Sequence, residues 1–348
     1  MYILPKDNSV TMPSEREEHT LLLSNIDVGS LVTFEDVVDA VERTWAEAAF
    51  GRVVNPPKLT LDLGESGTWP GYNAYMNAMP AYVGWLDSVG LKWAGGFWDN
   101  ILKGRPSISA MILLVDARTG RFKAVIEGSL ITALRTSAQT IVGIRHLAKK
   151  DLRSIGIYGA GTQAWYHILM ISKFFPSVKI LLYDTQKGLA KDLLTKIKKE
   201  VNLGMYQVEQ PMACSEADVI ITLTTSKTPF LRGEWIRKGQ TIAALGSYQE
   251  VYPEVIAGSD KIIVDNIQQS LHRGALKILS DKGMITEKDI FATIGEIVAG
   301  QKPGRERDEE VIFFEPIGTG MLDVAVATIV YNKAIQKGVG EGFKFFRF

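Results

Sequence analysis

A glycine-rich turn between an apolar run and an amphipathic stretch constrains this chain more than any other feature. The run 155–158 is long enough for one buried parallel strand. Gly-Ala-Gly-Thr-Gln-Ala follows at 159–164, a G-x-G-x-x-A turn whose first glycine makes the bend, whose second admits a pyrophosphate, and whose alanine lets a helix pack on the strand. A helix ending before Pro176 and a strand over 178–183 lead to Asp184, about 20 residues further on, where a ribose-binding carboxylate belongs. The pattern predicts a dinucleotide site.

Asp184 also bears on the choice of cofactor. Its carboxylate can accept hydrogen bonds from both ribose hydroxyls and would repel a 2′-phosphate. Thr185 and Gln186 offer no guanidinium for such a phosphate, although Lys187 is close. We therefore expect NAD(H) rather than NADP(H), contacted by the turn, by Asp184 and by three hydroxyl residues that follow the strand 219–223: Gly159, Ala160, Gly161, Thr162, Gln163, Asp184, Thr224, Thr225 and Ser226.

Bulk properties exclude several classes of protein. A chain of 348 residues suits two domains, and 39 basic against 39 acidic residues give no net charge that would favour nucleic acid or an anionic membrane. The single Cys214 excludes an intrachain disulfide and fits a reducing cytoplasm. Neither a signal peptide nor an apolar run of about 18 residues is present. No H-x-x-x-H or C-x-x-C pair occurs, so we expect no metal. These features favour a soluble cytoplasmic α/β enzyme.

Two kinds of pattern divide the chain. The first part has a capped helix starting at Thr33 and strands over 58–63, 79–83, 89–93, 107–115 and 122–127, of which 58–63 alternates like a half-buried strand. Later, strands at 219–223, 241–245 and 261–265 alternate with helices such as 188–201, the pattern of a doubly wound parallel sheet. A helix over 129–147 joins the two parts, and a second long helix, 321–337, precedes an aromatic tail.

Short motifs in a fixed order carry a family resemblance. They are Met-Pro-Ala-Tyr at 79–82, Leu-Lys-Trp at 91–93, Ile-Thr-Ala-Leu-Arg-Thr at 131–136, the glycine turn, Gly-Glu-Trp at 233–235, Gly-Glu-Ile at 295–297 and Lys-Pro-Gly at 302–304. With these the chain resembles the ornithine cyclodeaminase, μ-crystallin and archaeal-type alanine dehydrogenase family. The resemblance implies an NAD-binding Rossmann domain, 133–316, inserted in a sheet-rich α+β domain for substrate binding and homodimerisation, 1–132 plus 317–348. It also implies cofactor contacts at Thr136 and Gly246.

The resemblance further implies a basic cluster for the substrate's α-carboxylate. Lys92 and Arg135 stand at two of its positions, and Lys58, after Pro57, stands where the family usually has arginine. A guanidinium grips a carboxylate with two hydrogen bonds, whereas a desolvated lysine can also titrate, so Lys92 is the candidate acid/base. Each could instead be an ordinary surface charge. Trp93, Phe97 and Trp98 could wall the pocket or belong to the core.

Two positions depart from the cyclodeaminase pattern. Asn77 and Tyr248 stand where the cyclodeaminase branch has carboxylates, and neither is negative at neutral pH. Glu250 could supply the missing carboxylate if its loop is shifted. Because a buried ω-ammonium would lack a counter-charge, we expect ornithine to be a poor substrate and a neutral or aromatic side chain to be preferred.

We therefore expect an NAD(H)-dependent oxidoreductase acting on the C–N bond of an α-amino or α-imino acid. Lys92 and Arg135 are the catalytic candidates, and Lys58, Asn77 and Tyr248 are the substrate-binding candidates. Two alternatives remain open: a cyclodeaminase-type lyase that recycles NAD, and a non-catalytic protein that binds a nucleotide.

Overall fold

Two eight-stranded sheets organise the chain, which a computed structural model describes over residues 19–345. The first sheet is mixed and runs in the order β16-β1-β7-β6-β5-β4-β2, with β3 paired to β4. Only its β1–β7 pair is parallel. Its strands are β1 (Thr20–Leu23), β2 (Val53–Val54), β3 (Leu59–Asp62), β4 (Ala74–Val83), β5 (Ser88–Phe97), β6 (Ile108–Asp116), β7 (Phe122–Glu127) and β16 (Glu341–Phe343).

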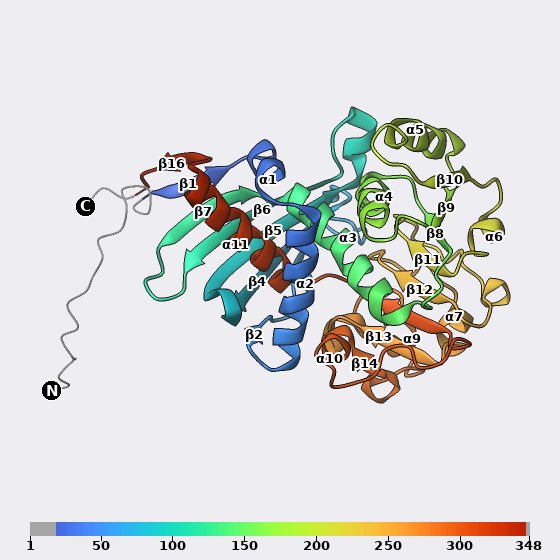
Figure 1. Cartoon of the computed structure of the whole chain (residues 1–348). Helices are drawn as coiled ribbons and strands as arrows, with labels where there is room; N and C mark the ends of the chain where they lie inside the picture. The colour runs from blue at the N-terminus through green and yellow to red at the C-terminus, as the bar shows by residue number, and fades with distance from the viewer. Residues whose placement is uncertain (1–18, 346–348) are drawn as a thin grey trace.

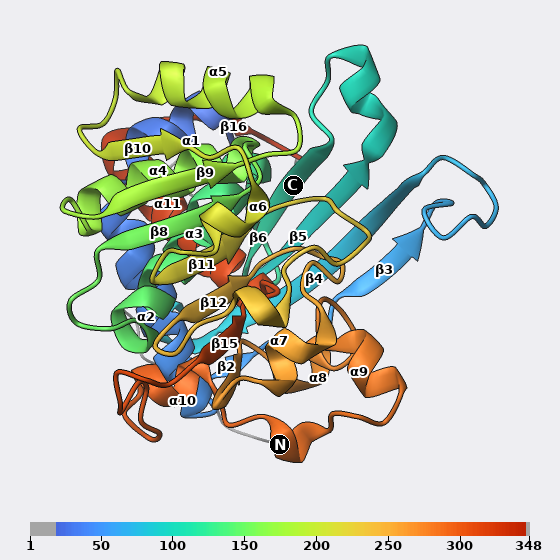
Figure 2. The same ribbon diagram turned by 90° about the vertical axis from the view of Figure 1, so that its right-hand side faces the viewer.

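The second sheet is parallel throughout, in the order β10-β9-β8-β11-β12-β15-β13-β14. Its strand order reverses between β8 and β11, where open α/β sheets bind ligands. Figure 2 shows these strands side by side, with β3 and β4 of the first sheet beyond them. The strands are β8 (Ser154–Tyr158), β9 (Lys179–Tyr183), β10 (Gly204–Gln207), β11 (Val219–Thr222), β12 (Thr241–Ala244), β13 (Lys261–Val264), β14 (Ala292–Thr293) and β15 (Ile312–Glu315). The expected Rossmann-type sheet is confirmed.

Helices cover one face of the first sheet and surround the second (Figure 1). The longer ones are α2 (Phe34–Ala49), α3 (Gly128–Leu147), α4 (Thr162–Phe174), α5 (Lys187–Ile197) and α11 (Gly320–Lys337). The shorter ones are α1 (Asn25–Leu31), α6 (Pro211–Cys214), α7 (Pro253–Ala257), α8 (Ile267–Ser270), α9 (Lys277–Asp281) and α10 (Ile294–Val298). Four short segments are 3₁₀ helices: η1 (Gly84–Leu86), η2 (Trp98–Lys103), η3 (Gly233–Trp235) and η4 (Glu287–Asp289).

Local sequence chemistry explains where α2 begins. The Thr33 side chain accepts from the Asp36 amide, and the Asp36 carboxylate accepts from the Thr33 amide at 2.7 Å. This reciprocal pair satisfies two of the amides that a helix start leaves free, so the predicted capping box is confirmed. Val37, Val41 and Trp45 then lie buried on one face of the helix.

Helix α3 connects the two sheets and builds the floor of the site, and α11 packs beside it. It starts after β7 of the first sheet, packs against α2, α4 and α11, and ends shortly before β8 of the second sheet. The expected domain boundary at 132–133 falls inside this continuous helix. Helix α11 is buried along most of its length, and Asp323 lies in its apolar first turns with none of its surface exposed.

Two sequence expectations need correction. The half-buried strand expected at 58–63 is an edge strand, and its Leu59 side chain is 74% exposed, because β3 pairs only with β4 and no helix covers it. Strand β15 was not predicted, although it lies inside the parallel sheet between β12 and β13 and its Phe313 and Phe314 are buried. The expected polar arm over 1–18 lies outside the described residues. Within 19–345, no helix is long and apolar enough to cross a membrane.

Candidate active site

The glycine turn has the geometry that a pyrophosphate requires. Gly159 has φ +100°, and a Cβ there would lie 2.8 Å from the Leu223 carbonyl oxygen, so only glycine fits. Gly161 is the N-cap residue of α4, which has no side-chain cap, and nothing lies within 4 Å of a Cβ built on it. The first amides of α4 therefore face open space, where the positive end of the helix dipole favours an anion.

Asp184 lies beside this turn, as the spacing predicted. One carboxylate oxygen accepts from the Ala160 amide at 2.8 Å and the other from the Gln186 amide at 2.7 Å. The carboxylate thus holds the turn to the end of β9, and its remaining lone pairs can accept from ribose hydroxyls. The donors, the open turn and the carboxylate together fit NAD(H).

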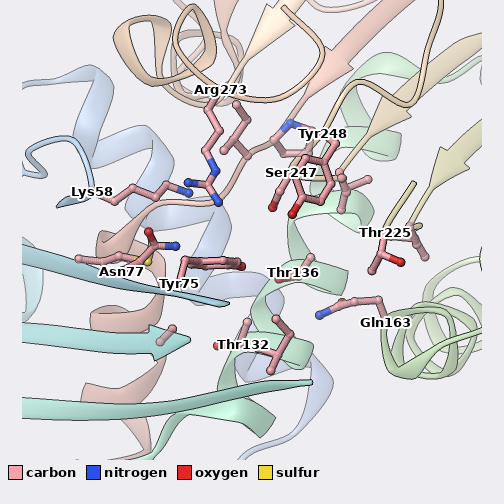
Figure 3. A pocket seen from close by; sticks show the side chains of 18 of the residues that line it. Lys58, Tyr75, Asn77, Thr132, Thr136, Gln163, Thr225, Ser247, Tyr248 and Arg273 are labelled. Atoms are coloured by element: carbon pink, nitrogen blue, oxygen red, sulfur yellow. The ribbon is translucent and has the colours of Figure 1, made fainter. Parts of the chain in front are cut away.

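A cavity of about 230 Å³ lies between this region and the first sheet. Its floor comes from α3, through Thr132, Arg135 and Thr136, and one side comes from β4 and β5, through Asn77 and Lys92. The opposite side comes from residues that follow β11 and β12. Figure 3 shows the polar side chains converging on this space. The predicted residues that line it are Lys58, Asn77, Lys92, Arg135, Thr136, Gln163, Thr224, Thr225, Gly246 and Tyr248.

The deepest charges in the cavity are Lys92 and Arg135, which share one carboxylate. Lys92 Nζ lies 2.7 Å from Asp323 Oδ2, and Arg135 Nε lies 2.9 Å from Asp323 Oδ1. Arg135 also donates to Gln139 at 2.5 Å. The Lys92 side chain is only 2% exposed. Burial, and then the Arg135 charge, lower the pKa of Lys92 to about 8 even though Asp323 opposes this shift. Lys92 can therefore exchange a proton near neutral pH.

Asp323 remains charged in this environment. Burial alone would raise the pKa of its carboxyl, but the adjacent Arg135 and Lys92 cations bring that pKa below its ordinary value. A second buried carboxylate, Asp265 at the end of β13, accepts from the Gly318 amide at 2.6 Å. Burial raises the pKa of Asp265 to about 6, against the effect of that hydrogen bond and of the Lys58 charge.

The side formed by the residues that follow β11 and β12 is neutral. No Asp or Glu among the described residues lines the cavity. Glu250 lies behind this side with all its bonds turned inward, to Thr222 Oγ1 at 2.6 Å, to the Thr224 amide at 2.8 Å and to the Gly246 amide at 2.9 Å. The idea that Glu250 replaces a catalytic carboxylate is therefore wrong: it ties the ends of β11 and β12 together.

A bridge between the two sheets closes the rim of the cavity. Tyr248, after β12, donates its hydroxyl hydrogen to Glu65, and Trp98 Nε1 donates to the same carboxylate at 2.7 Å. Burial, and then this hydrogen bond, raise the pKa of Tyr248, so its hydroxyl stays neutral. Trp98 lines the cavity, whereas Trp93 lies on the opposite face of β5 and is 46% exposed.

Some predicted residues do not reach the cavity, and some of its residues were not predicted. Gly159, Ala160, Gly161, Thr162 and Asp184 form the turn beside it, and Ser226 donates to the Thr228 carbonyl instead. Four residues in or beside the cavity were not predicted from the sequence: Asp323, Asp265, Tyr75 and Arg273. Asp323 had a signal, a lone carboxylate within the apolar run of α11, because such a residue is seldom buried without a partner. Arg273 lies in a loop, and no sequence pattern marks it as a site residue.

Fold and site together define a dinucleotide-binding protein with a buried, cation-rich pocket for a small acid. The family model for the ornithine cyclodeaminase/mu-crystallin family matches residues 18–338, and the chain belongs to this family. The expected family is thereby confirmed.

Similar proteins cover nearly the whole chain. Alanine dehydrogenase of Archaeoglobus fulgidus is 34% identical over 94% of this chain and 99% of its own. Iminosuccinate reductase of Paracoccus denitrificans is 31% identical, over 92% and 98%. Among solved structures, Thermococcus litoralis Δ1-pyrroline-2-carboxylate reductase with NADH and L-proline matches with a TM-score of 0.88 at 32% identity, covering 93% of this chain and 100% of that chain.

Proposed function

We propose that this protein is an NAD(H)-dependent oxidoreductase that acts on the C–N bond of an α-amino or α-imino acid. The observation that carries the proposal is the buried cluster of Lys92, Arg135 and Asp323, which faces a cavity beside a dinucleotide turn. The relatives support it, since their names include an amino-acid dehydrogenase and imine reductases. When bound, NAD(H) would accept or supply the hydride, held by the residues of the turn, Asp184 and the hydroxyl side chains after β11.

Arg135 is proposed to bind the substrate's α-carboxylate. Asp323 engages its Nε and Gln139 engages one Nη, so the guanidinium is held in a single orientation with its other edge toward the cavity. A fixed, desolvated guanidinium binds a carboxylate in two parallel hydrogen bonds and orients the carbon next to it.

Lys92 is proposed to move the proton. Thr132 Oγ1 lies 3.4 Å and Asp323 lies 2.7 Å from its amine, so the group is fixed beside the bound acid. In its neutral form it can take a proton from the substrate amine or from the water that attacks the imine. In its charged form it returns that proton in the reverse direction.

The cyclodeaminase alternative is disfavoured because no carboxylate of the described residues lines the cavity. That reaction must hold a second, cationic amine and then remove its proton, for which buried carboxylates are suited. Asn77 accepts from Thr60 at 2.7 Å, Tyr248 is neutral, and Glu250 faces away. Ammonia and proline formed from ornithine over many turnovers without net NADH would overturn this conclusion.

The proposal is tested by pairing turnover with cofactor binding. Oxo acids with ammonium and NADH, and amino acids with NAD⁺, are followed by absorbance at the nicotinamide band and by mass spectrometry of products. Arg135→Ala should abolish substrate saturation while NADH binding, measured by fluorescence, stays intact. Equal loss of both would contradict the role given to Arg135.

We also propose the two-domain division expected from the sequence, a cytoplasmic location and a homodimer.

Support for the dimer comes from an apolar row across the uncovered face of the first sheet. Its members are consecutive register partners: Leu59, Ala78, Trp93 and Met111. Trp93 and Met111 are 46% and 48% exposed. A similar structure is an archaeal alanine dehydrogenase dimer. Trp93→Glu should give a monomer by light scattering, and an unchanged mass would count against this face.

A further inference from the structure

A second pair of basic residues lies at the outer part of the same cavity, and neither forms a salt bridge with a carboxylate of the described residues. Lys58 comes from the segment before β3, and Arg273 comes from the loop between α8 and α9. Both line the cavity, and in Figure 3 their charged ends point toward one another above Asn77 and Tyr75. Among the described residues, no carboxylate oxygen lies within 4 Å of either, whereas Lys92 and Arg135 share Asp323.

Arg273 in particular has unused hydrogen-bonding capacity. Its Nε is buried and has no hydrogen-bond partner, and the contact between its Nη1 and Thr60 Oγ1 is long at 3.5 Å. The guanidinium carbon lies 5.6 Å from the centre of the Tyr75 ring, so the group rests on an aromatic face rather than against an acid. Burial, and then the Arg273 charge, lower the pKa of Lys58 even though the Asp265 carboxylate opposes this shift. An anionic ligand bound between Lys58 and Arg273 would favour their charged forms.

The loop that carries Arg273 is held in place from within the parallel sheet. Glu315, at the end of β15, accepts from the Ala275 amide at 2.5 Å and from the Leu276 amide at 3.3 Å. Glu315 is fully buried. Because the backbone beside Arg273 is anchored to a central strand, the guanidinium is presented to the cavity by the fold and not by a loose surface loop.

From this arrangement we infer that Arg273 and Lys58 form a second anion subsite, which selects substrates whose side chain ends in a carboxylate. The inference rests on the proposed function: Lys92 and Arg135 take the α-carboxylate, and the outer pair takes the second one. It gives Lys58 a different role from the α-carboxylate contact that the family resemblance implies. The planar guanidinium of Arg273 would bind that group through two hydrogen bonds, with Lys58 as an added point charge. An acidic amino or imino acid thus replaces the neutral or aromatic substrate expected from the sequence.

Binding of unreactive acids tests the subsite without requiring turnover. Affinities for propionate and for the diacids malonate, succinate and glutarate are measured by thermal shift in the presence of NADH. The wild type should bind its preferred diacid more tightly than propionate. Arg273→Gln should weaken diacid binding by about 10- to 100-fold, the range for one charge-assisted hydrogen-bonded contact, and leave propionate binding nearly unchanged.

A matched control and a second variant keep the test decisive. Arg232 also lies over a tyrosine ring, 5.2 Å from the centre of Tyr252, but it is exposed and outside the cavity, so Arg232→Gln should change neither affinity. Arg273→Lys should retain part of the diacid preference. If Arg273→Gln does not fold, Lys58→Gln should show the same selective loss.

Turnover then separates this inference from the proposed function. The ratio of kcat/KM for oxaloacetate or 2-oxoglutarate to that for pyruvate, each with ammonium and NADH, should fall by about 10- to 100-fold in Arg273→Gln. Equal losses for mono- and diacids, or a wild type that binds propionate as tightly as any diacid, would overturn the inference. Selective diacid binding without any hydride transfer would leave the subsite in place and refute the oxidoreductase.

Discussion

The two sides of the cavity differ in charge. The side built from the first sheet and α3 carries Lys92 and Arg135, which are buried against Asp323 of α11. The side built from the ends of β11 and β12 presents hydroxyls, backbone and the neutral Tyr248, and its carboxylate, Glu250, is turned inward. The cations proposed to hold the α-carboxylate thus come from the first sheet and from α3, whereas the ends of β11 and β12 offer an uncharged surface for the cofactor. Arg273 reaches the cavity from a third place, the loop between α8 and α9. Four predictions test this separation.

The largest effect is expected at the titrating amine of the charged side. Lys92→Met should lower kcat/KM by about 10²- to 10⁴-fold, the usual contribution of a general acid/base. In the wild type the pKa of about 8 means that the neutral amine increases as pH rises. Amino-acid oxidation should therefore rise up to about pH 8 and level off above it. A Lys92→Met enzyme with an unchanged pH profile would exclude this role.

Removing the shared carboxylate should cost stability. Asp323→Ala leaves two buried cations without a counterion, which destabilises proteins by about 3–5 kcal/mol. Denaturant unfolding measures this loss. Asp281→Ala is the control, because that carboxylate pairs with Lys277 on the surface, where such pairs contribute about 0.3–0.5 kcal/mol. Similar losses in the two variants would show that the cluster is not the electrostatic unit described above.

Glu250, behind the side of the cavity that follows β11 and β12, should matter for stability and not for catalysis. Glu250→Gln replaces an acceptor of several inward hydrogen bonds with an amide that can satisfy only some of them. We expect a loss of about 1–3 kcal/mol in the free energy of unfolding and little change in kcat/KM. A stable variant with a large loss of activity would make Glu250 catalytic and revive the cyclodeaminase.

The smallest effect concerns the cofactor. Wild type should bind NADH at least about tenfold more tightly than NADPH, equivalent to about 1.4 kcal/mol, because Asp184 would repel a 2′-phosphate. Asp184→Ala should narrow that gap, as measured by fluorescence titration. A wild type that prefers NADPH would indicate that another residue, such as Lys187, captures the phosphate.

The sequence was informative where short-range chemistry decides the structure. The turn at Gly159, the capping box at Thr33 and the cations Lys92 and Arg135 all follow from neighbouring residues or from motifs. Arg273 could not be found in this way, because its position depends on Glu315, which is remote in sequence and holds the adjacent backbone. The apolar alternation of 58–63 was misleading for a related reason. It identifies a strand, but burial depends on what covers that strand.

Helix α3 has a consequence for how this protein can change over evolution. Thr132, Arg135 and Thr136 occupy adjacent turns of this one helix. The group proposed to bind the acid and the residue expected to contact the cofactor therefore belong to one rigid element. The helical rise of about 1.5 Å per residue fixes the spacing between these three residues. Movement of one sheet against the other does not change that spacing. The distance between the bound acid and the cofactor therefore does not depend on the peripheral loops. Substitution of a loop residue such as Arg273 can change which substrate side chains fit without changing that distance.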